Sequence, residues 1–263
     1  MILIDREKCV GCGVCINDCI AQIIKIDDGK AIAEGECLHC GHCVAICPEN
    51  AVSIPEYDME DVEEYDAEMF DIDAAKLLRS IKFRRSVRNY KHMSVKKEDL
   101  EMLVQAGRYT ATAKNNQDTH FVFVQDAIQE LKERVYGFID DIRKSEGKNL
   151  SKDMLTYVVF SRRRKADPSD DFLFRNAPCV LFITSDWPVD PGLAAQNIET
   201  MAAALGMGAL YNGYLARIAD ANDELKKWLG IEGKTIKACM LLGYPDVSYV
   251  RTAPRKNANV IWK

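Results

Sequence analysis

The chain contains the run Cys9-Val-Gly-Cys12-Gly-Val-Cys15-Ile-Asn-Asp-Cys19 and, further on, the run Cys37-Leu-His-Cys40-Gly-His-Cys43-Val-Ala-Ile-Cys47-Pro48. Both follow the spacing C-x2-C-x2-C-x3-C, and together they hold eight of the ten cysteines. With this spacing three thiolates wrap one cubane iron–sulfur cluster and the fourth thiolate ligates the other cluster. We therefore predict two 4Fe-4S clusters, one held by Cys9, Cys12, Cys15 and Cys47 and the other by Cys37, Cys40, Cys43 and Cys19.

Two other uses of these cysteines fit less well. A disulfide framework suits small secreted domains, whereas no leader precedes Cys9 and the chain is long. Zinc sites use two C-x2-C pairs separated by a longer gap. The region resembles the bacterial two-cluster ferredoxins, although Ile20 stands where those proteins have proline after the fourth cysteine.

Composition sets limits on the class of protein. The chain has 263 residues, of which 48% are hydrophobic, so we expect a sizeable core and more than one domain. Apolar runs such as residues 180–184 are too short to cross a membrane. Thiolate-held clusters without a targeting segment predict a cytoplasmic protein. No basic run is interleaved with aromatic residues, so we do not expect nucleic-acid binding.

The charge changes sign along the chain. The net charge is −4 over residues 1–54, −10 over residues 55–75 and +9 over residues 76–263. Like charges at high density favour an extended, solvated path, although three aromatic residues in 55–75 leave docking on a surface open. We predict a ferredoxin-like domain over 1–54, an acidic linker over 55–75 and a second domain over 76–263.

Periodicity predicts the elements. In the first domain we expect strands at 2–4, 23–26, 31–33 and 52–54, and helical turns after Cys15 and Cys43 that bury Val44 and Ile46. In the second domain we expect strands at 121–124, 179–184, 207–211 and 236–242. Helices are expected at 74–82, after caps at Ser94 and Asp126, over 148–166 and 193–205, and after a cap at Asn222. Helices and strands do not alternate strictly, so the predicted class is α+β.

Basic residues mark a possible second site. Arg84-Arg85-Ser86-Val87-Arg88 gathers guanidinium groups, which suit phosphate because their planar fork donates two parallel hydrogen bonds. A solvated basic turn explains the same residues, and spacing alone does not bring Arg255 and Lys256 to them. The run 161–165 is more simply a charged helix face. Core packing is the simpler role for Tyr211 and Tyr214, and Cys179 and Cys239 are expected to be inert core thiols.

Six short motifs in order resemble the nitroreductase family of flavin enzymes. They lie at residues 84–90, 114–121, 195–198 with 204–208, 212–213, 242–245 and 254–256. With the cysteine runs, the whole chain resembles ferredoxin–nitroreductase fusion proteins. The resemblance implies a nitroreductase-like FMN-binding domain, FMN held without a covalent bond, and a homodimer.

The resemblance also implies roles for individual residues. Arg84, Arg85, Ser86 and Arg88 would hold the FMN phosphate and ribitol, and Arg255 with Lys256 would close on the phosphate. Asn115 and Gln117 would reach the flavin of the partner subunit. Asn212 and Gly213 would present backbone N–H groups near flavin N5, where donors stabilise charge on the reduced ring. The chain has Gln117-Asp118-Thr119 where the family often has Gln-Pro-Trp, and Asn212 where it often has Glu.

Three functions follow as hypotheses. In the first, a low-potential donor of the ferredoxin type feeds the clusters, which feed FMN, which reduces a small nitroaromatic, quinone or activated alkene. In the second, NAD(P)H reduces the flavin directly and the clusters are an outlet or a structural element; the lack of a glycine-rich dinucleotide fingerprint does not decide between them. In the third, the chain is a non-enzymatic electron-transfer subunit.

Overall fold

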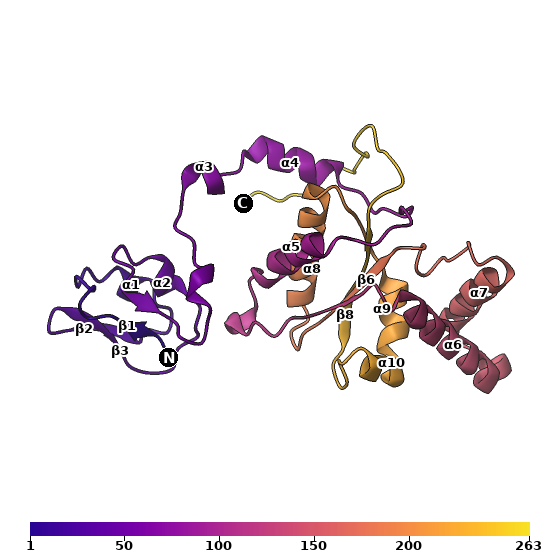
Figure 1. Cartoon of the computed structure of the whole chain (residues 1–263), viewed down its shortest axis with the longest axis horizontal. Helices are drawn as coiled ribbons and strands as arrows, with labels where there is room; N and C mark the ends of the chain where they lie inside the picture. Colours follow the sequence, from indigo (N-terminus) through magenta and orange to yellow (C-terminus); the bar gives the residue numbers. More distant parts are fainter. The chain divides into compact units, whose positions relative to one another are not determined.

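The computed structural model describes all residues from Met1 to Lys263 and divides into two compact bodies (Figure 1). The first comprises Met1–Ile72 together with Lys114–Asn116, and the second comprises Asp73–Ala113 and Gln117–Lys263. No helix in the chain combines the length and the apolar character that a membrane span requires.

The first body repeats one small unit twice. Strand β1 (Leu3–Ile4) pairs antiparallel with β4 (Val52–Ser53), and β2 (Ile24–Asp27) pairs antiparallel with β3 (Lys30–Ala33). The single-turn helices α1 (Val14–Asn17) and α2 (His42–Ala45) each follow a glycine in the left-handed conformation. The four strands and two turns expected from the sequence are therefore present.

The apolar core of the first body is small. It consists of Ile2, Ile24, Val52 and Ile54, two alanines and the half-buried residues around them, packed with the cysteines. Val44 is half-buried, but Ile46 is 38% exposed, so the expectation that both are buried against the clusters is wrong for Ile46. The reason is that α2 lasts only one turn, and Ile46 is already its C-cap.

The acidic stretch after Ile54 contains short helical elements rather than only extended chain. Helix η1 (Met59–Asp61) is capped by Asp58 and α3 (Ala67–Phe70) by Asp66, whose carboxylates accept backbone N–H bonds of 2.9–3.1 Å. The N-terminal ammonium group of Met1 pairs with Glu56 at 2.6 Å. Some of the acidic residues therefore act as helix caps and ion-pair partners.

A four-stranded sheet organises the second body. Its order is β5 (His120–Val124), β6 (Cys179–Thr184), β8 (Ile236–Gly243) and β7 (Gly208–Tyr211), and every neighbouring pair is antiparallel. All six residues of β6 are buried, as a strand covered on both faces must be. An antiparallel sheet with helices on both faces confirms the α+β class.

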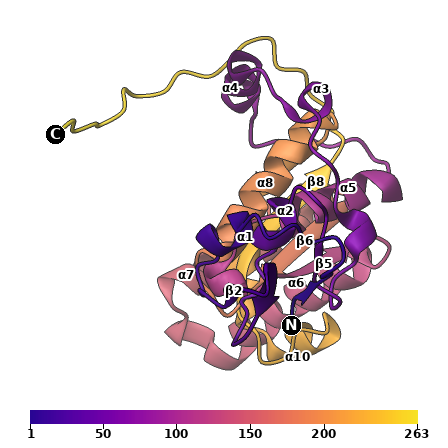
Figure 2. The ribbon, with the colours of Figure 1, turned by 90° about the vertical axis from the view of Figure 1, so that its left-hand side faces the viewer.

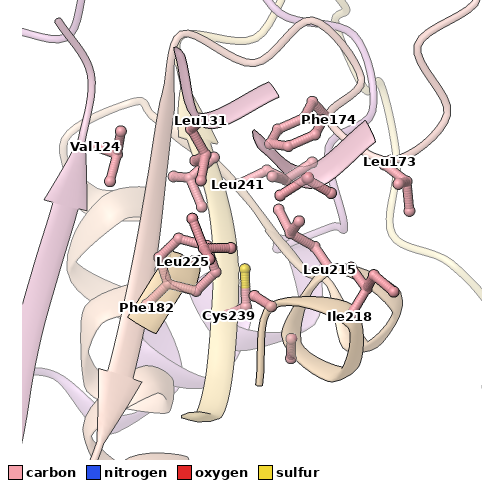
Figure 3. Close-up of a cluster of buried hydrophobic side chains, with 14 of the residues drawn as sticks. Val124, Leu131, Leu173, Phe174, Phe182, Leu215, Ile218, Leu225, Cys239 and Leu241 are labelled. Carbon is pink, nitrogen blue, oxygen red and sulfur yellow. The ribbon is translucent and has the colours of Figure 1, made fainter. Parts of the chain in front are cut away.

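Alternating side chains divide the core into two clusters, one on each face of the sheet. Phe182 and Leu241 pack against helices α6, α7, α9 and α10, whereas Leu181 and Met240 pack against α5 and α8. Figure 3 shows the first cluster, with Phe182 of β6, Leu241 of β8 and Leu215 of α9 among its side chains. The helices are α5 (Lys97–Arg108), α6 (Ile128–Glu146), α7 (Lys152–Ala166), α8 (Asp190–Ala204), α9 (Gly213–Asp220) and α10 (Asp223–Trp228).

Some predicted helix starts are confirmed and others are wrong. Asp73 caps α4 (Ala74–Phe83) through a 2.6 Å bond, and Asn222 caps α10 through a 3.0 Å bond. Ser94 and Asp126 cap nothing, because α5 begins at Lys97 and α6 at Ile128 without side-chain caps. Helices α7 and α8 begin at Lys152 and Asp190 instead of residues 148 and 193. Helix α9 was not predicted at all.

The segment that follows α4 is fixed to the edge of the sheet. Val87 N–H donates to the Ala209 carbonyl at 3.0 Å, and Ser86 forms a parallel bridge with the same residue of β7. A Cβ atom on Gly208 would lie 2.6 Å from the Val87 Cβ, so only glycine permits this approach. Beyond Tyr244 the chain runs to its C-terminus as a tail without helix or strand (Figure 2).

We expect the substitution Gly208→Ala to lower the free energy of unfolding by about 1–3 kcal/mol, because the added methyl group overpacks against Val87. Gly137→Ala is the matched control, since a Cβ there meets nothing within 4 Å and alanine favours helix α6 by about 0.5–1 kcal/mol. Urea unfolding followed by circular dichroism measures both. Equal stability of the two variants would contradict the packing described here.

Candidate functional site

Each predicted quartet of cysteines lines its own cavity in the first body. One cavity is lined by Cys9, Cys12, Cys15 and Cys47, and the other by Cys19, Cys37, Cys40 and Cys43. The structure thus brings the fourth cysteine of each run to the three cysteines of the other run. No group of three or more His, Cys, Asp or Glu side chains in the chain is arranged to hold a single metal ion.

Three of the cysteine sulfur atoms accept hydrogen bonds from backbone N–H groups, which stabilise negative charge on a thiolate. Backbone N–H groups of Ala31, His39 and Ala51 donate to the sulfurs of Cys9, Cys37 and Cys47, each at 3.3 Å. Donation from Ala31, followed by that from Gly11, lowers the pKa of Cys9.

Burial has the opposite effect on another thiol of the set. It raises the pKa of Cys43 to about 11, and the neighbouring thiols Cys37 and Cys40 add to the rise. Bound iron would reverse this penalty, because a coordinating thiol loses its proton to the metal's charge. The donor set therefore fits iron–sulfur clusters.

Glycine is required inside the first cysteine run. Gly11 has φ +72°, and a Cβ atom on it would lie 2.1 Å from the Gly29 carbonyl oxygen. This contact fixes the Cys9–Cys12 loop against the β2–β3 turn. Between the ligands of the second run, His42 is exposed and bonds to Asp18 at 3.1 Å, whereas half-buried His39 lies edge-on to Tyr57.

The two remaining cysteines belong to the core of the second body. Cys179 and Cys239 are both buried in strands. Burial raises the pKa of Cys179 to about 12 and raises that of Cys239 well above its usual value. Thiols in this state are poor nucleophiles and ligands, as the sequence led us to expect.

The arginine segment contains buried donors that no protein group satisfies. Arg84 Nη1 donates to Glu199 Oε1 at 2.5 Å, and Glu199 is only 2% exposed on helix α8. Arg84 Nε, Arg85 Nη2 and Glu199 Oε2 are buried and have no hydrogen-bond partner. Burial raises the pKa of Glu199, while Arg84 opposes the rise. Sequence analysis missed Glu199, because nothing local to residues 195–199 marks it as the partner of a residue 115 positions earlier.

Asn212 has a different role from the one we predicted. Its N–H donates to the Cys239 carbonyl at 2.8 Å, and its side chain accepts from Leu215 N–H and donates to the Leu173 carbonyl. Its backbone donor is therefore used inside the protein, which corrects the expectation that it faces the flavin. The N–H groups of Gly213 and Tyr214 open helix α9 and have no partner in the chain.

The start of helix α9 lines one pocket of the second body, whereas Arg84, Arg85 and Glu199 are not part of that lining. Its lining includes Arg88, Tyr211, Asn212, Gly213 and Tyr214. Tyr211 and Tyr214 are each 39% exposed, so the expectation that these two residues pack in the core is wrong. They are exposed because β7 lies at the edge of the sheet and α9 starts immediately after it.

Other predicted site residues lie elsewhere. Asn115 has φ 55° and donates from its side chain to the Leu38 and His39 carbonyls, both at 3.0 Å, as part of the first body. Gln117 N–H donates to the Thr112 hydroxyl at 3.0 Å. Arg255 and Lys256 are exposed in the C-terminal tail, and the structure does not bring them to Arg84.

The basic run on α7 is paired with acidic residues. Arg163 forms a two-pronged ion pair with Asp170 at 2.7 and 2.8 Å, and Lys165 pairs with Asp140. Ser161 is buried and bonds to the same Asp140. These bonds fit the simpler reading of the run as a charged helix face.

Comparison with known proteins assigns both parts of the chain. Residues 81–244 match the nitroreductase family, and residues 1–48 match the 4Fe-4S dicluster domain. The chain belongs to the nitroreductase family. It is 26% identical over 186 residues to the NADPH-flavin oxidoreductase of Vibrio harveyi, an overlap that covers 70% of this chain and 71% of the relative.

Two further likenesses concern the separate parts. The N-terminal part is 34% identical over 59 residues to a ferredoxin of Methanothermococcus thermolithotrophicus, covering 21% of this chain and 98% of that ferredoxin. A nitroreductase of Bacteroides fragilis solved with FMN superimposes with a TM-score of 0.57 at 23% identity, covering 72% of this chain and 99% of that one. This nitroreductase-family chain is therefore a flavin oxidoreductase that carries a ferredoxin-type 4Fe-4S domain.

We expect Cys12→Ser and Cys40→Ser each to disrupt a different cluster, since they line different cavities. Two clusters hold about eight iron atoms per chain. Each single variant should lose up to about four of these iron atoms, and the double variant should lose most of them. Cys179→Ala is the control, because that thiol is buried in β6. Iron analysis of anaerobically purified protein measures the content. Full iron content in either ligand variant would contradict the assignment.

Proposed function

We propose that this chain binds FMN without a covalent bond and carries electrons from a low-potential donor through two 4Fe-4S clusters to FMN and on to a small acceptor. The acceptor would be a nitroaromatic, a quinone or an activated alkene. The observation that carries the proposal is that one chain contains two cavities lined by four cysteines each, a segment with unsatisfied buried guanidinium nitrogens, and a pocket at the unpaired N–H groups of helix α9.

The arginine segment 84–88 suits FMN, and its last residue, Arg88, lines the pocket beside α9. The unsatisfied nitrogens of Arg84 and Arg85 would bind the phosphate, and Ser86 and Glu199 Oε2 would bind ribityl hydroxyls. Arg255 and Lys256 of the C-terminal tail would add to the phosphate site, and Asn115 and Gln117 would contact the flavin of the partner subunit. FMN, once bound, would supply the two-electron chemistry that no side chain provides.

The start of helix α9 gives the pocket a positive electrostatic potential. Gly213 and Tyr214 direct unused N–H groups out of the positive end of the helix, where negative charge is favoured. Arg88 lines the same pocket and carries a permanent charge. These groups would favour a cofactor that gains electron density.

Exposed apolar residues support a homodimer. Leu78, Ile81 and Phe83 of α4 are 46–55% exposed, and Ile261 and Trp262 of the tail are 85% and 91% exposed. Apolar surface of this kind commonly marks a protein–protein contact. We propose that a second copy of the chain covers it.

The second candidate function uses NAD(P)H as the donor. The observation that favours it is the likeness to the Vibrio harveyi protein, which is named an NADPH-flavin oxidoreductase. In this case the clusters would be an electron outlet or a structural element.

A reductive titration under strict anaerobiosis tests the direction of electron flow. We expect reduced ferredoxin to bleach both the cluster and the flavin absorbance, whereas NADH and NADPH act slowly or not at all. In Cys12→Ser, ferredoxin should no longer reduce the flavin, although FMN stays bound, because Cys12 and the pocket for FMN belong to different compact bodies.

The same titration contains the outcomes that overturn the proposal. Rapid bleaching by NADPH in both the wild type and Cys12→Ser establishes the second candidate instead. Unimpaired reduction of Cys12→Ser by ferredoxin shows that electrons bypass the first cluster. Cys179→Ala again serves as the control, since it removes a thiol that is not part of either quartet.

A further inference from the structure

The pocket beside α9 contains more positive charge than the flavin motif accounts for. Besides Arg88, its lining includes Arg175, from the loop before β6, and Arg217, one turn into α9. Neither Arg175 nor Arg217 belongs to the motifs that carry the family resemblance. From this surplus we infer an acceptor subsite that recognises an anionic group, a carboxylate or its equivalent, on a planar unsaturated molecule.

A cluster of aromatic rings, formed by Phe160, Phe172 and Tyr214, lies beside these arginines. Phe160 stacks on Phe172 with ring centroids 4.2 Å apart, and Tyr214 meets Phe172 edge-on at 6.1 Å. The Arg175 guanidinium lies over the Phe172 ring at 4.0 Å, and the Arg217 guanidinium lies over Tyr214 at 5.3 Å. Phe172 and Tyr214 themselves line the pocket. The rings thus hold the two guanidinium groups in the pocket lining, and a flat anionic molecule can stack on a guanidinium plane and pair with its charge.

No carboxylate of the protein forms an ion pair with Arg175 or Arg217, although Asp170 and Asp171 lie near enough to raise the pKa of Arg175. Asp170 is engaged by Arg163, and Asp171 is engaged by Lys132 at 2.8 Å and by Tyr136. Arg217 has a phenol, Tyr157, as its polar neighbour. The other acidic residues of the surrounding elements are also occupied or outside the pocket lining: Asp153, Asp167 and Asp220.

The crowding of positive charge has a measurable consequence. Partial burial lowers the pKa of Arg175, and the nearby Arg88 and Arg163 lower it further. A half-buried cation among other cations is costly unless a counter-charge binds. Asp170 and Asp171 oppose this lowering of the Arg175 pKa only in part, so a ligand with a negative charge gains a favourable interaction.

FMN itself also carries a negative group, its phosphate. The unsatisfied nitrogens that suit its phosphate are those of Arg84 and Arg85, and they accompany Glu199 of α8. The guanidinium groups of Arg175 and Arg217 instead lie over the rings of Phe172 and Tyr214. The inference rests on the proposed function, since it places the acceptor of that reaction, and the experiment separates the two anions.

The test compares 4-nitrobenzoate with 4-nitrobenzamide, which share the ring and the nitro group but carry a charge of about −1 and 0 near neutral pH, given the usual carboxyl pKa. In each case the nitro group takes two electrons and two protons and gives a nitroso group and water. The FMN holoenzyme is reduced in the absence of air by light with EDTA as the electron donor and mixed with each acceptor, and the return of the flavin absorbance gives a second-order rate constant.

We expect the wild type to prefer 4-nitrobenzoate by about tenfold or more, the size of one charge-assisted contact. Arg175→Gln and Arg217→Gln should each reduce this preference by about tenfold, and added salt should reduce it in the wild type. Arg162→Gln is the matched control, because it removes one exposed positive charge from α7 outside the pocket. Its preference should equal that of the wild type.

A binding measurement keeps the inference independent of turnover. Benzoate added to the oxidised holoenzyme should shift the flavin spectrum with higher affinity than benzamide, and Arg217→Gln should remove the difference. If neither nitro compound is reduced but benzoate still binds selectively, the proposed function fails and the anion subsite stands.

Three results would overturn the inference. The first is equal rate constants and equal binding for the charged and neutral compounds. The second is an unchanged preference in both arginine variants. The third is loss of FMN from Arg175→Gln or Arg217→Gln, with phosphate competing for the same site, which would assign these arginines to the cofactor.

Discussion

The close approach of Val87 to Gly208 fixes the segment after α4 against strand β7 in the second body. Because position 208 has no side chain, the segment after α4 can bond to the edge strand β7 through Val87 and Ala209. Because this bridge is parallel, Arg88 then lies toward the end of β7, where α9 begins, and lines the pocket there. One small residue therefore connects a basic motif early in the domain with amide donors more than a hundred residues later.

The first body differs, because its small apolar core contributes little stability and thiolate–iron bonds would have to contribute the rest. Its strands have two to four residues each, its helices have one turn, and its apolar core is small. A unit of this size buries too little apolar surface to be stable by itself. Thiolates bonded to the iron of a 4Fe-4S domain would supply stabilising free energy, and cluster binding would then be coupled to folding of this body.

The charges of the second body fall into two groups with different consequences. On α7 the basic residues find carboxylate partners, as Arg163 does with Asp170, and such exposed pairs contribute little to stability. Around the α9 pocket, Arg88, Arg175 and Arg217 have no such partner and stand next to aromatic rings. Residues of the same type are therefore structural in one place and available to a ligand in the other, and the difference lies in which acidic residues the fold brings near.

The sequence by itself determined the features that depend on local spacing. The cysteine runs predicted the two quartets, short apolar runs predicted the buried strands, and Asp73 and Asn222 predicted helix starts, because each of these patterns acts over a few residues. Only the tertiary structure decided the features that depend on distant partners. It paired Arg84 with Glu199, used the Asn212 N–H inside the sheet, and exposed Tyr211 and Tyr214 at a sheet edge. It also placed Arg175 and Arg217 at one pocket. These contacts join residues 27 to 115 positions apart, as Asn212 and Cys239 or Arg84 and Glu199 are, and no local pattern records which distant residues will meet.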